Sequence, residues 1–304
     1  MRLSSAIHQF FRKDLPHIKA LSPHTIKAYR DCFKLFLPYA ANYHGIKISS
    51  LQIAHLSVEV ILDFLDSLEK QRKNLAKTRN NRLAAIKSLA KMIRFMYPDQ
   101  RKLAYQILSI PQKRCQRPLI GFLYPDEIDR ILQAVDLNNA LGVRDYCLLQ
   151  LLYDSGARAT EIATLNLDYF NAHNKTLAIL GKGNRFRQLN LSPTTVKMIK
   201  AYTINHRRRP KADYAKRLFI SQHGKALTRH GIYRLCRKYL RLALSEKRLD
   251  VLNPVHSFRH SCAVRMLCSG DSITAIKNRL GHGNLQSTMT YLDMDVSHKR
   301  SIQE

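Results

Sequence analysis

Apolar residues recur at the spacing of an α-helix along most of the chain. The clearest case is residues 75–97, whose apolar side chains fall on one helical face. These side chains are Leu83, Ile86, Leu89, Ile93 and Met96. Comparable patterns predict helices over residues 57–70, between Pro98 and Pro111, and over residues 140–154, 192–206 and 227–245. The chain is therefore predicted to be mainly α-helical.

Local capping signals place the start of another helix. Ser22 directly precedes Pro23. Serine is favoured at the N-cap of a helix, and proline is favoured at its first turn. We therefore expect this helix to begin at Pro23.

The one convincing β signal lies in residues 176–191. Two short apolar runs, 177–180 and 186–191, flank the turn sequence Gly181-Lys182-Gly183-Asn184. Glycine and asparagine at such a turn are typical of a β-hairpin. The predicted fold class is therefore mainly α with a small antiparallel β-hairpin or sheet, that is, α+β.

A change in composition divides the chain. Residues 109–122 contain two prolines, a glycine and three basic side chains but no acidic one. Such a segment is typical of an interdomain linker. We therefore predict a helical N-terminal domain over residues 1–108, a linker over 109–122 and a second domain over 123–304.

The charge narrows the range of partners. Lys and Arg together number 51 against 22 Asp and Glu, which gives a formal net charge of +29. Both domains carry the excess, which favours a polyanion that contacts both. Three basic residues of the helix predicted over residues 75–97 share a face, and two more follow the hairpin turn. These candidate DNA contacts are Lys87, Lys91, Arg94, Arg185 and Arg187.

Cysteine usage and the apolar segments bear on location. The six cysteines include no C-x-x-C pair, and several fall in apolar helical runs, so we expect buried, reduced thiols. The N-terminus lacks the apolar core of a signal peptide, and no apolar run approaches the length of a membrane span. These features predict a cytoplasmic, nucleoid-associated protein without a membrane partner.

The candidate chemistry lies near the C-terminal end. His256 and Arg259 are three residues apart and share a helical face. His282 follows Gly281, a predicted helix stop, and Tyr291 lies a short distance beyond. A phenol has a pKa of about 10, so it becomes a useful nucleophile only where cations stabilise the transition state. The cluster therefore suggests phosphoryl transfer through a tyrosine.

Two further groups complete this cluster. Arg158 follows a glycine turn at a predicted helix start, and Glu161, three residues on, is placed to orient its guanidinium. Lys182 lies at the tip of the hairpin, from which it could deliver a proton to a leaving oxygen.

These six groups, in this order and spacing, resemble the signature of the tyrosine recombinases, the family of phage integrases and Xer-like enzymes. They are Arg158, Lys182, His256, Arg259, His282 and Tyr291. The residues from Ser22 to Tyr29 are similar to the opening of the family's N-terminal DNA-clamping domain, which is helical and SAM-like. Ser257-Phe258 departs from the Asp-Leu of many members.

The resemblance implies a specific chemistry. Tyr291 attacks a DNA phosphate and forms a 3′-phosphotyrosyl link, while Arg158, Arg259 and His282 stabilise the phosphoryl group. Lys182 protonates the leaving oxygen, and His256 assists proton transfer at the nucleophile. No cofactor is implied, neither ATP nor a metal. The implied partners are double-stranded DNA with inverted half-sites and further protomers, as a homo-tetramer on two sites or a hetero-tetramer with a paralogous recombinase.

Other interpretations differ in class. His256 and His260, at i and i+4, could ligate zinc, but no third ligand is evident. A type IB topoisomerase uses nearly the same groups to relax DNA, and an architectural DNA-binding protein needs no tyrosine at this spacing. Within the recombinases, we favour a mobile-element enzyme for integration, excision or transposition. Xer-like resolution of chromosome or plasmid dimers is the alternative.

Overall fold

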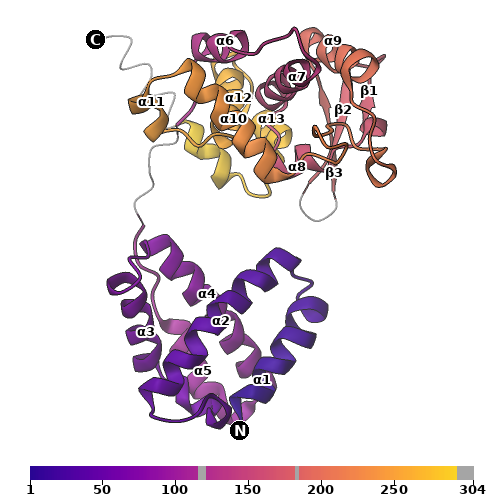
Figure 1. Ribbon diagram of the computed structural model, residues 1–304. Helices are drawn as coiled ribbons and strands as arrows, with labels where there is room; N and C mark the ends of the chain where they lie inside the picture. Colours follow the sequence, from indigo (N-terminus) through magenta and orange to yellow (C-terminus); the bar gives the residue numbers. More distant parts are fainter. Residues whose placement is uncertain (116–120, 182–184, 293–304) are drawn as a thin grey trace, which may run out of the picture. The chain divides into compact units, whose positions relative to one another are not determined.

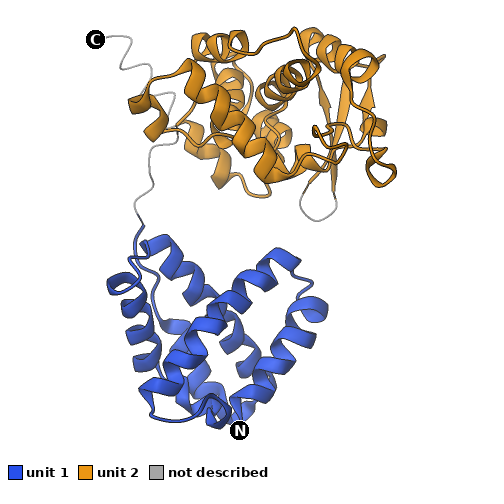
Figure 2. Ribbon diagram, in the orientation of Figure 1, with its two compact units in different colours: residues 1–117 blue, residues 118–304 orange. Residues whose placement is uncertain are grey.

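The computed structural model describes residues 1–115, 121–181 and 185–292. The chain divides into two compact units, residues 1–117 and residues 118–304 (Figure 2). Each unit has its own hydrophobic core, so each is described by itself. The predicted linker, residues 109–122, falls partly outside the described residues.

In its described part, the first unit contains helices and no named β-strand (Figure 1). Its core is rich in aromatic rings, among which Phe33, Phe36 and Phe64 pack edge to face. The helices are α1 (Leu3–Gln9), α2 (Pro23–Tyr43), α3 (Val58–Lys70), α4 (Ala76–Met96) and α5 (Arg101–Ser109), with a π-helical segment over Phe10–Ile18 after α1.

Local caps explain where two of these helices begin. The Oγ of Ser22 accepts a hydrogen bond from the backbone N–H of Thr25, and the Oγ of Ser57 accepts one from that of Val60. Each cap satisfies a donor that the first helical turn leaves unpaired. The predicted start at Pro23 is confirmed, and so are the helices predicted over residues 57–70 and 75–97.

The second unit combines helices with a small sheet (Figure 1). Three antiparallel strands lie in the order β1-β2-β3: β1 (Phe170–Asn171), β2 (Thr176–Leu180) and β3 (Phe186–Asn190). The helices are α6 (Pro125–Gln133), α7 (Ala140–Ser155), α8 (Ala159–Ala163), α9 (Pro193–Ala201), α10 (Arg229–Ala243), α11 (Glu246–Asp250), α12 (His256–Cys268) and α13 (Ile273–Leu280). The predicted α+β class is confirmed.

The predicted hairpin is present as strands β2 and β3, and β1 is added to it as a third strand. Leu177 pairs with Leu189, and Ile179 pairs with Arg187. Next to the turn, the N–H of Gly181 donates to the carbonyl of Arg185 at 2.8 Å. Residues 182–184, which include Lys182, lie outside the described residues. The sequence did not indicate β1, because two residues are too short to show an alternating pattern.

The cysteines were predicted to be buried, reduced thiols. Four cysteines are buried and all six are free, but Cys115 and Cys268 are exposed. The expectation that all six are buried is therefore wrong, because these two fall on solvent-facing positions.

None of the helices in the described part of the chain combines the length and the apolar character that a bilayer crossing requires.

Candidate active site

The site is built around the turn that ends α7. Gly156 caps this helix in the left-handed conformation, with φ of +61° and its N–H on the carbonyl of Leu152 at 3.0 Å. A Cβ at this position would lie 2.5 Å from Cδ2 of Leu280. Glycine is therefore required both by the backbone angle and by the close approach of α13. The turn leads directly into Arg158, the N-cap of α8.

Arg158 is oriented by Glu161, as the spacing of the two residues predicts. One carboxylate oxygen accepts from the guanidinium of Arg158 at 2.8 Å, and the other accepts from its backbone N–H at 2.8 Å. The Glu161 side chain is 5% exposed, whereas that of Arg158 is 34% exposed. The carboxylate thus fixes an arginine that still reaches solvent, where an anion can approach it.

Arg259 lies on α12 and is almost fully buried, at 4% exposure. Its guanidinium donates to the carbonyl of Gly156 at 2.6 Å and to that of Leu280 at 2.7 Å. Burial and the neighbouring charge of Arg158 lower the pKa of Arg259 to about 10. The two arginines therefore repel each other, and the site favours an anion that would relieve this repulsion.

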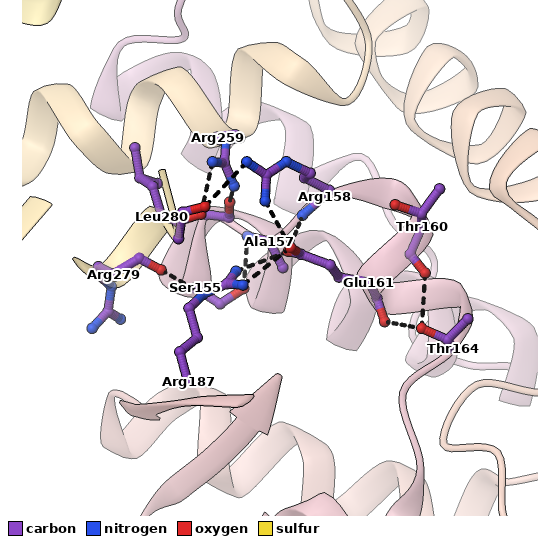
Figure 3. A network of polar contacts seen from close by, with 12 residues as sticks. Ser155, Ala157, Arg158, Thr160, Glu161, Thr164, Arg187, Arg259, Arg279 and Leu280 are labelled. Atoms are coloured by element: carbon purple, nitrogen blue, oxygen red, sulfur yellow. Dashed lines mark hydrogen bonds and ion pairs between the residues drawn. The ribbon is translucent and has the colours of Figure 1, made fainter. Parts of the chain in front are cut away.

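Three consecutive backbone carbonyls at the end of α13 each accept from a different arginine (Figure 3). The carbonyl of residue 279 accepts from Arg187 at 2.9 Å, that of Leu280 from Arg259 at 2.7 Å, and that of Gly281 from Arg158 at 3.3 Å. The C-terminal end of a helix carries partial negative charge, because its last carbonyls lack helical partners. This end of α13 thus gathers the arginine cluster.

A buried aspartate anchors α13 to α7. The carboxylate of Asp154 accepts from Arg279 at 2.9 Å and from the backbone N–H of Ser192 at 2.8 Å. Burial alone would raise the pKa of this carboxyl, but hydrogen bonds from Ser192 and Thr195 and the charge of Arg279 hold it below its ordinary value. The three carbonyls of residues 279–281 form what we call the carbonyl row. Its position therefore depends on this ion pair.

His282 and Tyr291, the two predicted site residues beyond α13, lie side by side. The rings of His282 and Tyr291 stack with centroids 6.4 Å apart and planes 6° apart. Nδ1 of His282 lies 2.8 Å from Oγ1 of Thr288. Tyr291 is 2% exposed, and burial raises the pKa of its phenol to about 12. In this arrangement the phenol is protonated and shielded from solvent.

The hydroxyl of Tyr291 contacts His260 and lies 2.8 Å from Nδ1 of the histidine. Burial and the charges of nearby His256 and Arg259 lower the pKa of His260 to about 3, so its ring is neutral at pH 7. Burial and the neighbouring arginines likewise lower the pKa of His282 to about 4. From the sequence, His260 was predicted only as a possible zinc ligand. Its i+4 spacing from His256 was the available signal, since it places both rings on one face of α12.

The histidine pair is arranged as stacked rings. The centroids of His256 and His260 lie 6.2 Å apart. Among the residues that the structure describes, no three His, Cys, Asp or Glu side chains form a group that could hold a metal ion.

The five candidate DNA contacts occupy different environments. Lys91 and Arg185 are exposed, and Arg94 lies over the ring of Tyr105. Nζ of Lys87 donates to the carbonyl of Leu108 at 2.7 Å and so joins α4 to α5. Arg187 is paired with Glu161, and its side chain is only 13% exposed. Of the five, Lys87 and Arg187 are thus already engaged within the protein.

A basic surface that sequence reasoning missed lies on α10. Apolar residues of this helix face the core, and the opposite face carries basic residues without any acidic one. These exposed residues are Arg229, His230, Arg234, Arg237, Lys238 and Arg241. The signal was present in residues 227–245 as a helical run with several basic and no acidic side chains, a pattern typical of a phosphate-facing surface.

The chain is similar to known proteins over nearly its full length. The phage integrase family matches residues 121–298, and the SAM-like N-terminal domain of phage integrases matches residues 7–94. A putative integrase/recombinase of Sinorhizobium fredii is 30% identical over 98% of this chain and 90% of its own length. The tyrosine recombinase XerC of Anoxybacillus flavithermus is 30% identical over 83% of this chain and 82% of its own.

Solved structures share the fold. The XerH recombinase bound to a palindromic difH substrate matches with a TM-score of 0.74 and 20% identity, over 99% of this chain and 87% of its own. The Tn1549 transposon integrase bound to transposon right end DNA gives a TM-score of 0.71 and 17% identity, over 97% and 99%. The family match over more than half of the sequence and the two relatives at 30% identity show that the chain belongs to the phage integrase family and is a tyrosine-type site-specific DNA recombinase.

Proposed function

We propose that Tyr291 is the nucleophile, and that Arg158 and Arg259 bind the scissile phosphate together with His282. The observation that carries this proposal is the convergence of both guanidiniums on the adjacent carbonyls of residues 280 and 281, next to His282 and its stacked tyrosine. A phosphate offers stronger acceptors than a carbonyl row, because its oxygens carry full negative charge. DNA would therefore compete for these donors.

The chemistry follows from the groups assembled. The oxygen of Tyr291 forms a bond to phosphorus as the bond from phosphorus to the 5′ oxygen breaks, which gives a 3′-phosphotyrosyl link. Arg158, Arg259 and His282 stabilise the charge on the nonbridging oxygens in the transition state. Lys182, from the hairpin, supplies the proton for the leaving 5′ oxygen. The phenol proton passes to a histidine, for which His256 is the candidate by resemblance and His260 the one in contact.

Tyr291 must move before it attacks. Its hydroxyl is bonded to His260, and its ring is almost fully buried, so a DNA phosphate cannot reach the oxygen. The chemistry therefore requires a rearrangement of the segment around Tyr291 when DNA binds. We assign the arrangement described above to the resting enzyme.

The proposed setting is a mobile element. The similarity to a putative integrase/recombinase over nearly the whole chain supports this choice, and the similarity to XerC favours dimer resolution as the alternative. The active assembly would be a tetramer on two DNA sites with inverted half-sites, formed by this chain alone or with a paralogous recombinase. It would act in the cytoplasm at the nucleoid.

Covalent capture from a library of DNA sequences tests the function and selects the DNA site at the same time. The protein is incubated with nicked duplexes of randomised sequence, and complexes that survive denaturation are collected and sequenced. We expect the wild type to enrich a sequence with inverted half-sites. Tyr291→Phe should bind the enriched duplex with unchanged affinity but form no covalent complex. Covalent complexes with the Phe variant would exclude Tyr291 as the nucleophile.

A further inference from the structure

We propose that Arg187 is a positioning residue for cleavage, which holds Glu161 and the end of α13 so that Arg158 is aimed at the phosphate. This inference rests on the proposed function of Arg158. It assigns a role to a basic side chain beside the hairpin that was predicted from the sequence to contact DNA. The contacts of Arg187 within the protein carry the argument.

The pairing of Arg187 with Glu161 is bidentate (Figure 3). One guanidinium nitrogen donates to Oε1 at 3.0 Å, and the other donates to Oε2 at 2.8 Å. Arg158 uses the same two oxygens through its guanidinium and its backbone N–H. Each carboxylate oxygen thus accepts two hydrogen bonds, which fills the acceptor capacity of the group. Glu161 is fixed from both sides.

The third donor of Arg187 reaches the carbonyl row. Its Nε donates to the carbonyl of Arg279 at 2.9 Å. The guanidinium also lies against Gly281, where an added Cβ would be 2.9 Å from its nitrogen and where φ is +64°. Arg187, on β3, therefore joins α8 to the end of α13, the two segments whose groups accept hydrogen bonds from Arg158.

The burial of Arg187 separates this role from DNA binding. Its side chain is 13% exposed, against 34% for Arg158. Its nitrogen atoms all donate to protein oxygens, so DNA would have to break a bidentate ion pair to engage it. Arg187 also adds to the positive charge that lowers the pKa of Arg259. A buried positive charge on Arg187, close to Arg158 and Arg259, is unfavourable by itself. The need to orient Glu161 accounts for an arginine at this position.

The test compares three variants on the duplex enriched by covalent capture. Arg187→Gln removes the bidentate pair, and Arg187→Lys keeps the charge but cannot form the fork. Lys197→Gln, on the exposed face of α9, removes one charge from the same unit and serves as the matched control. The measurements are DNA affinity, thermal unfolding and the single-turnover cleavage rate at saturating protein.

We expect Arg187→Gln to bind DNA within about threefold of wild type but to cleave roughly 10–100-fold more slowly, since small displacements of a catalytic group have effects of this size. Arg187→Lys should be slowed as well, and Lys197→Gln should match the wild type. If Arg187→Gln does not fold, the Lys variant carries the test. A wild-type cleavage rate in the folded variant would overturn the proposal.

A second substrate separates positioning from a general structural defect. Replacing one nonbridging oxygen of the scissile phosphate by methyl makes the group neutral, so a misaimed Arg158 matters less. The defects of the Arg187 variants and of Arg158→Ala should then shrink together. An equal defect on both substrates, or a loss of DNA affinity in place of rate, would show that Arg187 does not act through Arg158. Failure of the wild type to form any adduct would instead contradict the proposed function itself.

Discussion

The Nδ1 atom of His260 lies 2.8 Å from the hydroxyl of Tyr291. This bond joins a histidine that burial keeps neutral to a phenol that burial keeps protonated. The pair is stable as a neutral couple, because neither partner bears a charge that the interior would penalise. Tyr291, the proposed nucleophile, is thus held by His260, the residue that follows Arg259 on α12.

This pairing predicts an acid-sensitive structure. The pKa of His260 falls from 6.5 to about 3 in the folded state. The neutral ring therefore contributes to stability above about pH 6.5, and this contribution is lost as the pH falls towards 3. His256, Arg259 and His282 face this ring and oppose its protonation. Between pH 7 and pH 4 the wild type should lose roughly 2–3 kcal/mol through this group.

The measurement compares His260→Asn with the wild type. Asparagine places a polar atom near the position of Nδ1 but does not titrate. Urea unfolding at pH 7 and at pH 4 should show a smaller fall in unfolding free energy for the variant. Identical pH dependence in the two proteins would contradict the assignment. His282, also shifted downwards, is present in both and does not affect the comparison.

The anchor of α13 predicts a stability effect. Asp154→Asn keeps the shape of the side chain but removes the charge that pairs with Arg279. Breaking a buried pair leaves an uncompensated charge, so we expect a loss of roughly 3 kcal/mol in unfolding free energy. Asp126→Asn is the control, because its pair with Arg130 lies on the surface and should contribute little. Equal effects of the two substitutions in urea unfolding would refute this account.

The basic face of α10 predicts a salt-dependent contact with DNA. Arg234→Gln and Arg237→Gln should each weaken DNA binding and reduce the slope of log affinity against log salt by about 1, because each contact with a phosphate releases a counterion. Cleavage at saturating protein should be unchanged. Lys197→Gln, on α9, should leave the slope as it is. Unaltered affinity and slope in both arginine variants would remove this face from the DNA-binding surface.

The proposed role of Lys182 predicts a chemical rescue. A lysine can give up its proton at neutral pH more readily than an arginine, so it suits protonation of the 5′ oxygen. Replacing that bridging oxygen by sulfur gives a leaving group that needs little protonation. Lys182→Ala should be severely slow on normal DNA and nearly normal on the sulfur substrate. Arg158→Ala should stay slow on both, since the nonbridging oxygens are unchanged. A Lys182→Ala variant that remains equally slow with sulfur would assign this lysine to another role.

Local features of the sequence determined much of the fold. The caps at Ser22 and Ser57 act within one helical turn, so they can be recognised without knowing any tertiary contact. The stop at Gly281 is local in the same sense, because its positive φ disfavours other residues. The pairing of Arg158 with Glu161 also follows from a spacing of three residues.

The tertiary structure alone decided which of these groups meet. Arg187 contacts Glu161 and the carbonyl of Arg279, which are 26 and 92 positions away in the sequence. His260 contacts Tyr291 across 31 positions. No local pattern encodes such distances, because they are fixed by how α12, α13 and β3 pack around the end of α7. The sequence by itself therefore determined the chemical groups of the candidate site and the local turns that present them, while packing decided which partners hold the arginines and Tyr291.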